Sequence, residues 1–201
     1  MLPNGFLYMD EAVEGIFWDA KYAGSDNFVG APVDGYASGR VVGTSELAQA
    51  LCCVRDRAKE KGYSLLLWDA YRPQRAVDHF VRWCAQKEDG KTKEKHYPNI
   101  ERHRMIPMGY IAARSGHSRG STIDLTLCDS EGNQVDMGGW FDLMDERSHH
   151  DYTHLTAEQR ENRALLRELM LDCGFVDYKN EWWHYRLKNE PYPDTFFDFP
   201  I

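Results

Sequence analysis

The sequence predicts an α+β domain over residues 1–201, with a small, mainly antiparallel sheet and helices packed on it. Two observations lead to this prediction. Apolar residues recur at helical spacing after Thr44 and again after Thr156, whereas residues 64–68 form a short apolar run typical of a buried strand. Two further strand-like runs lie close together within residues 175–187 and favour an antiparallel hairpin that closes the sheet.

Residues 1–43 are rich in glycine, aspartate and aromatic residues and support no firm assignment. The first helix is expected to begin at a Thr44 or Ser45 cap and to end at Gly62. Its apolar stripe consists of Leu47, Leu51, Val54 and Ala58. The strand at 64–68 follows, and residues 69–73 then turn into a second helix that has Pro73 near its first turn.

The middle of the chain is harder to assign. Residues 87–104 are charged and lack a period, so we expect a solvated loop or a surface helix. Residues 109–113 are predicted to be a strand, and residues 121–127 to be another. The segment 128–155 has no clear period and is expected to be a long loop, which is more often functional than idle in a compact domain.

The last elements have clearer signals. Residues 156–159 read Thr-Ala-Glu-Gln, which fits a capping box, and the helix that they start is expected to end at Gly174. Residues 175–178 and 182–187 are predicted to form the closing hairpin.

Composition limits the classes of partner. A hydrophobic content of 42% is typical of a globular chain, and a net charge of −8 argues against nucleic acid or an anionic membrane as the main partner. The N-terminus has no basic region followed by an apolar run, so no signal peptide is expected. The five cysteines lack a Cys-x-x-Cys pair and are predicted to be reduced, buried thiols of a cytoplasmic protein. They are Cys52, Cys53, Cys84, Cys128 and Cys173.

The stretch SGHSRGSTIDLTL at 115–127 places a carboxylate inside an apolar strand. Strand alternation puts Thr122, Asp124 and Thr126 on one face, and the apolar residues on the other. Gly116 and Gly120 allow a turn that brings His117 close to the start of this strand. Asp124 is therefore expected to face a cleft with His117. The alternative is a carboxylate that is hydrogen-bonded to Arg119 or to a neighbouring threonine.

A second candidate stretch is NEWWHY at 180–185. Glu181 and His184 are three residues apart, so in a regular strand they would face opposite sides. For both to serve one site, Glu181 must lie in the bend before the strand, or a bulge must intervene. The alternative is a core strand with a solvent-facing glutamate and a hydrogen-bonded histidine.

Together, His117, Asp124 and His184 make a suitable three-ligand set for catalytic zinc, with Glu181 as the adjacent base. The remaining histidines are expected to be surface or locally hydrogen-bonded residues. They are His79, His96, His103, His149, His150 and His154.

These motifs resemble those of the VanX-type D-alanyl-D-alanine dipeptidases, zinc enzymes related to D,D-carboxypeptidases and to the zinc module of hedgehog signalling domains. The resemblance extends to FWDAKYAGSDNF at 17–28, DAYRP at 69–73 and WFDLMDERSHH at 140–150, so it covers nearly the whole chain. It implies the fold of that superfamily and one Zn²⁺ per chain, bound by His117, Asp124 and His184. Glu181 would then take a proton from the zinc-bound water and pass it to the leaving amine.

The resemblance also implies roles for five other residues. Arg72 would stabilise the oxyanion, although from the sequence alone a structural salt bridge with Asp69 is the simpler reading. Asp142 and Tyr22 would hold the ammonium group of the substrate, although from the sequence alone a loop-capping role for Asp142 is the simpler reading. Ser115 and Tyr36 would contact its C-terminal carboxylate.

One position departs from the family pattern, because Thr122 stands where a small alanine is common. Its hydroxyl is expected to bond Asp124 or to narrow the site, which affects substrate preference more than zinc binding.

The sequence therefore predicts a zinc dipeptidase that cleaves D-Ala-D-Ala, either in glycopeptide resistance or in recycling D-alanine, and leaves open whether it forms a homo-oligomer. Two other zinc-binding classes stay open: a D,D-carboxypeptidase that acts on longer peptidoglycan peptides, and a zinc-binding module without catalysis. The presence of both Glu181 and Arg72 argues against the second. A structural protein without any metal is the third alternative.

Overall fold

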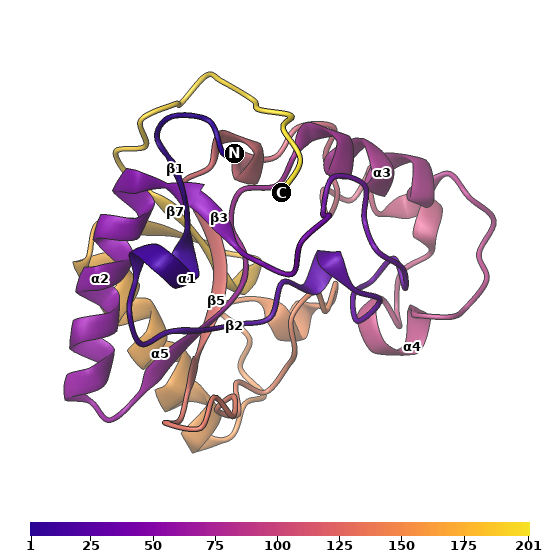
Figure 1. Cartoon of the computed structure of the whole chain (residues 1–201). Coiled ribbons are helices and arrows are strands. Elements are labelled where there is room, and N and C mark those ends of the chain that lie inside the picture. The colour runs from indigo at the N-terminus through magenta and orange to yellow at the C-terminus, as the bar shows by residue number, and fades with distance from the viewer.

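The computed structural model describes residues 1–201 and has two sheets with five helices (Figure 1). The strands are β1 (Phe6–Tyr8), β2 (Phe17–Trp18), β3 (Val42–Thr44), β4 (Ser64–Asp69), β5 (Thr122–Cys128), β6 (Phe175–Tyr178) and β7 (Glu181–Leu187). The helices are α1 (Met9–Ala12), α2 (Ser45–Glu60), α3 (Gln74–Cys84), α4 (Lys93–His96) and α5 (Ala157–Asp172). Short 3₁₀ turns lie at Lys21–Ala23, Arg102–Arg104, Gly116–Arg119 and Glu146–Ser148.

The larger sheet has the strand order β2-β4-β5-β7-β6, so β5 lies at its centre. All its pairs are antiparallel except β2 with β4, which is parallel, and β1 pairs with β3 in a separate two-stranded sheet. All seven residues of β5 are buried. The α+β class and the mainly antiparallel sheet are thus confirmed.

Helices α2 and α5 contact each other and the larger sheet, whereas α3 and α4 lie well away from them (Figure 1). The side chain of Thr44 caps α2 by accepting a hydrogen bond from the Leu47 amide. The predicted capping box is present at α5, where the side chain of Thr156 and that of Gln159 each bond the other residue's backbone N–H. The predicted helices and the closing hairpin are therefore confirmed.

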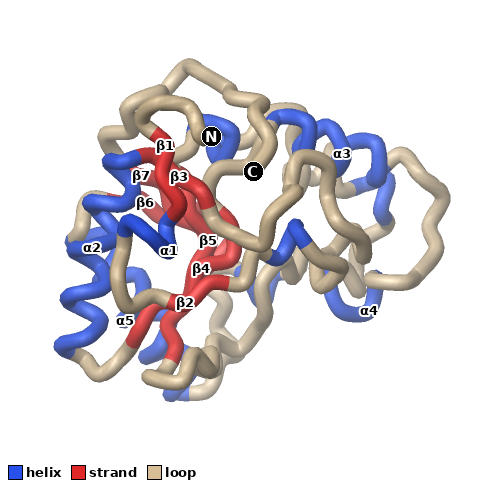
Figure 2. Tube along the Cα trace, in the orientation of Figure 1, coloured by secondary structure: helices blue, strands red, loops and turns tan.

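Two predictions for the middle of the chain are wrong. Residues 109–113 form no strand but an irregular segment. The charged segment 87–104 is not simply solvated, because His96, Tyr97, Ile100 and Arg102 are buried. Its buried residues are spaced irregularly along short helices and turns, so no hydrophobic period in the sequence predicts their burial. Figure 2 shows how little regular structure this part of the molecule contains.

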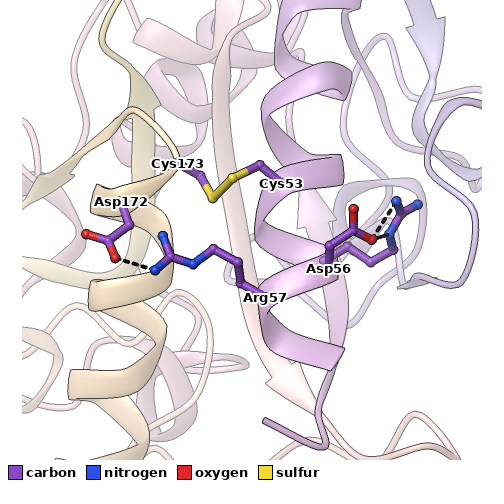
Figure 3. Close-up of a disulfide and its surroundings, with 6 residues drawn as sticks. Cys53, Asp56, Arg57, Asp172 and Cys173 are labelled. Carbon is purple, nitrogen blue, oxygen red and sulfur yellow. Dashed lines mark hydrogen bonds and ion pairs between the residues drawn. A yellow bond between two sulfur atoms is a disulfide. The ribbon is translucent and has the colours of Figure 1, made fainter. Parts of the chain in front are cut away.

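The cysteine prediction is also wrong for two of the five residues. Cys53 on α2 and Cys173 at the end of α5 form a disulfide, and Arg57 pairs with Asp172 beside it (Figure 3). The two cysteines are 120 residues apart in sequence and meet only because α2 and α5 pack together, so no local spacing reveals the pair. Cys52, Cys84 and Cys128 are free thiols. Disulfides are rare in the cytosol, so the cytoplasmic location stays a prediction.

The chain has no helix that is both long enough and apolar enough to cross a membrane.

Candidate active site

The turn before β5 brings His117 to the sheet. The side chain of Ser115 accepts a hydrogen bond from the His117 amide and caps the 3₁₀ turn, which Gly120 ends at a φ of 84°. A Cβ atom at position 120 would lie 2.4 Å from the ring of Phe6. Only glycine fits this backbone and this close approach, so the turn depends on Gly120.

Three adjacent strands each contribute one polar residue at the same level of the sheet. Asp124 on β5 pairs with His184 on β7 on one side and with Asp69 on β4 on the other. The register of β4 shifts between Leu67 and Asp69, and this irregularity places Asp69 rather than Trp68 opposite Asp124. Cross-strand neighbours lie on one face, so the three side chains meet.

His117, Asp124 and His184 come together as predicted. His117 Nε2 lies 3.2 Å from Asp124 Oδ2, and His184 Nδ1 lies 3.0 Å from Asp124 Oδ1. The two imidazoles approach to 3.3 Å through His117 Nε2 and His184 Nδ1. One ligand atom from each residue lies within 4.8 Å of the others, so the three side chains can hold a metal ion.

The surroundings of His117 suit a metal ligand. Its Nδ1 lies 2.7 Å from the carbonyl oxygen of Ala70, which can only accept, so Nδ1 carries a proton, and in the neutral imidazole Nε2 is the nitrogen left to bind a metal ion. Burial lowers the pKa of His117, which favours the neutral form that binds metals. Such a bond on the far ring nitrogen orients most metal-bound histidines.

Asp124 is buried, yet it is held in the charged form. Burial acts to raise its pKa, but attraction to His117 and contacts with both imidazoles outweigh burial and hold the pKa below its usual range. Its Oδ1 is buried and makes no hydrogen bond, although His184 Nδ1 is near. A buried acceptor without a partner beside two imidazoles is the environment that a cation completes.

Glu181 lies beside this cluster. Its Oε2 is 3.4 Å from His184 Nδ1, and its side chain is 23% exposed. The register of β6 against β7 shifts between Asp177 and Tyr178, so Tyr178 pairs with Glu181 while Asp177 pairs with Tyr185. A bulge of this kind is one of the two arrangements, a bend or a bulge, that the sequence allowed for Glu181 and His184 to share a site. Burial raises the pKa of Glu181 to about 6.

Arg72 follows β4 and joins the same cluster. Its Nε donates to Asp69 Oδ2 at 2.9 Å, and its Nη2 lies 3.4 Å from Asp124 Oδ2. The salt bridge with Asp69 that the sequence offered as the simpler reading is thus present. The guanidinium nevertheless lines the cavity and lies 4.9 Å from the ring centroid of Tyr22. Arg72 is therefore held in place next to the three residues that could hold a metal ion.

Tyr22 and Asp142 meet across 120 residues of sequence. The Tyr22 hydroxyl donates to Asp142 Oδ2 at 2.8 Å, and no cationic side chain pairs with Asp142. Burial raises the pKa of Asp142 well above its usual range. Asp142 adopts a left-handed φ of 58°, which aspartate tolerates better than most residues. His96, buried in the segment expected to be solvated, lies 3.1 Å from the Asp142 carbonyl through Nδ1 and supports this loop.

These side chains line one cavity of about 310 Å³, at the small end of the range of about 300–1,000 Å³ for ligand pockets. Of the nine residues predicted for the site, all except Tyr36 line it. The hydroxyl of Tyr36 instead donates to Asp69 at 2.6 Å. Sequence reasoning missed Tyr110, Ile111 and Arg114, which also line the cavity. Tyr110 and Ile111 belong to the segment 109–113 predicted as a strand, and Arg114 directly follows it.

Thr122 packs against the turn rather than bonding Asp124. Its buried hydroxyl makes no hydrogen bond, and a Cβ atom at Gly116 would lie 2.8 Å from that hydroxyl oxygen. Because threonine at position 122 is larger than alanine, it requires the glycine at position 116.

Gly116→Ala is expected to lower the free energy of unfolding by about 1–3 kcal/mol, because the new methyl group overpacks against Thr122. Adding Thr122→Ala should recover at least half of that loss, a non-additivity that urea denaturation of the single and double variants measures. Gly24→Ala, with open space around its Cβ, is the control and should change little. Equal stability of Gly116→Ala and the parent, or no recovery in the double variant, would contradict the packing argument.

A buried His-Asp-His set, with a carboxylate and an arginine beside it in a small cavity, is the arrangement of a metallohydrolase active site.

Comparison with known proteins gives the family. Residues 3–201 match the model of the D-ala-D-ala dipeptidase family of peptidases, to which the chain belongs. A D-alanyl-D-alanine dipeptidase of Streptomyces coelicolor is 58% identical, and one of Enterococcus faecalis is 55% identical, each over 100% of both chains. A solved structure, "VanYB in complex with D-Alanine-D-Alanine", is 17% identical over 78% of this chain and 77% of that one. Its TM-score of 0.44 is too low to support a conclusion.

Proposed function

We propose that the protein hydrolyses D-alanyl-D-alanine to two molecules of D-alanine, with Zn²⁺ bound by His117, Asp124 and His184. The observation that carries the proposal is the convergence of these three side chains in a small cavity next to Glu181. Two imidazoles and one carboxylate suit zinc and leave one position for water. When bound, zinc supplies a Lewis acid that activates water and polarises the scissile carbonyl.

Glu181 is the general base in this proposal. Its carboxylate accepts a proton from the attacking water and then donates it to the leaving amine. Burial raises the pKa of Glu181 above its ordinary value, and a carboxylate whose pKa lies closer to the working pH can both accept and return a proton.

Arg72 stabilises the negative charge that develops on the carbonyl oxygen of the substrate. Its bond to Asp69 fixes the guanidinium before substrate arrives, so little reorganisation is needed during the reaction. The loss of one such donor typically costs about 3–4 kcal/mol of transition-state stabilisation.

Asp142 and Tyr22 bind the ammonium group of the substrate. Asp142 is half-buried and has no cationic partner of its own, so a substrate ammonium completes its pairing. Ser115 lines the same cavity and is proposed to contact the substrate carboxylate. The structure offers no such role for Tyr36, whose hydroxyl bonds Asp69.

This arrangement predicts a strong preference for the free dipeptide over N-acetyl-D-Ala-D-Ala, because acetylation removes the ammonium and leaves Asp142 unpaired. We expect kcat/KM to differ by at least about 10⁴-fold, the scale of discrimination when a buried polar group loses its partner. Release of D-alanine from both substrates measures it. Equal cleavage of the two would instead identify a D,D-carboxypeptidase for longer peptides. Zinc binding without cleavage of either would identify a binding module.

We infer that the reaction belongs to cell-wall precursor metabolism, either in glycopeptide resistance or in returning D-alanine as a nutrient. A cytoplasmic location is part of this proposal, and cell fractionation tests it. The partner is a small dipeptide, and a homo-oligomer stays open to a sedimentation measurement.

A further inference from the structure

The cavity is lined by two arginines whose surroundings differ. Arg72 is engaged by Asp69 at 2.8 Å and lies 3.4 Å from Asp124. Arg114 has no carboxylate within 4.0 Å, and its guanidinium carbon lies 4.8 Å from the ring centroid of Phe196. No lysine lines the cavity. Arg114 is thus the one lysine or arginine of the cavity wall without an anionic partner.

The carboxylates of the cavity wall are the reason why Arg114 matters for a dipeptide substrate. Asp124, Asp142 and Glu181 all line the wall, and their carboxylates repel a substrate carboxylate. Arg72 already faces two of the protein's own carboxylates, so its charge is largely compensated. A free guanidinium such as that of Arg114 can bind a carboxylate through two parallel N–H donors.

Arg114 is also well placed along the chain. It directly precedes the turn at 115–120 that carries His117. The backbone on either side is held, because Gln74 Nε2 donates to the Ala113 carbonyl at 2.9 Å and the Ser118 amide donates to the Ser115 carbonyl at 3.1 Å. The side chain itself is exposed and bound only by the weak contact with Phe196, so it can turn toward a ligand.

We propose that Arg114 is a specificity-determining residue that binds the C-terminal carboxylate of the dipeptide. The inference rests on the proposed function, which supplies a substrate with a free carboxylate. Together with Asp142 at the ammonium, Arg114 gives the cavity one group of opposite sign for each end of the zwitterion. A peptide extended or capped at its C-terminus has no carboxylate at this position and leaves Arg114 without a partner. The cavity therefore binds the free dipeptide in preference to such peptides.

Arg114→Gln is expected to lower kcat/KM for D-Ala-D-Ala by about 10- to 100-fold, mainly through a higher KM, because it removes a charged hydrogen-bonded pair. For D-Ala-D-alaninamide, which lacks the carboxylate, the same substitution should change kcat/KM by less than about threefold. Arg114→Lys keeps the charge and should recover part of the loss on the dipeptide. Arg104→Gln removes an exposed arginine outside the cavity and should change neither substrate.

The two substrates separate the outcomes. Suppose that the parent protein cleaves D-Ala-D-Ala. If Arg114→Gln then loses activity equally on the dipeptide and the amide, or loses no activity on either substrate, the proposed role of Arg114 is wrong, whereas the proposed function stands. If the parent protein cleaves neither substrate, the proposed function is wrong and the role of Arg114 falls with it.

Discussion

Glu181→Ala is expected to hydrolyse D-Ala-D-Ala about 10²- to 10⁴-fold more slowly than the parent protein while it keeps its zinc. The reason is the position of Glu181: its carboxylate lies 3.4 Å from His184 Nδ1 but outside the His117-Asp124-His184 set. Removing it takes away the proton acceptor and leaves all three proposed ligands. Steady-state kinetics with elemental analysis of the same dialysed sample measures both quantities.

The matched control for this variant is Glu168→Ala, an exposed glutamate of α5 that forms no ion pair, which should change neither activity nor zinc content. Loss of zinc together with activity in Glu181→Ala would make Glu181 a ligand and reverse its assigned role. Full activity without Glu181 would remove the general base from the mechanism.

The sequence was sufficient to predict the centre of this site because the relevant signals are local. Alternation along β5 separates Asp124 from the apolar face, and the glycines around His117 indicate a turn. The spacing of Glu181 and His184 required either a bend before the strand or a bulge, and the pairing of β6 with β7 has such an irregularity. At these positions a short stretch of chain fixes the direction of the side chain, and the side chains of His117, Asp124 and His184 come together as the sequence predicted.

Predictions failed where distant segments determine the structure. The disulfide depends on the packing of α2 against α5, which brings Cys53 to Cys173 across 120 residues. The irregular segment that contains Tyr110 and Ile111 forms part of the cavity wall, yet its short apolar run resembles a strand in the sequence. The burial of His96 follows from contact with the loop of Asp142, and neither stretch has a period. Such contacts are set by tertiary packing and leave no pattern in a single sequence.

Asp124→Asn is expected to weaken zinc binding by at least about 100-fold and to reduce hydrolysis of D-Ala-D-Ala accordingly. The change keeps the size of the side chain but removes the charge that faces His117 at 3.2 Å and His184 at 3.0 Å. Loss of a group that merely orients a ligand costs about 10- to 100-fold in metal affinity, so loss of a ligand should cost more. Competition with a chromophoric chelator measures the affinity.

Asp129→Asn is the matched control, because Asp129 follows β5 directly and is exposed, and it should bind zinc as the parent protein does. A purely structural role for Asp124, as the partner of Arg72, predicts a different pattern: stability would fall while zinc affinity stayed unchanged. Excess zinc distinguishes the two roles, since it should restore part of the activity of Asp124→Asn only if the residue acts through the metal. Unchanged zinc affinity in a folded Asp124→Asn protein would therefore refute the three-ligand assignment.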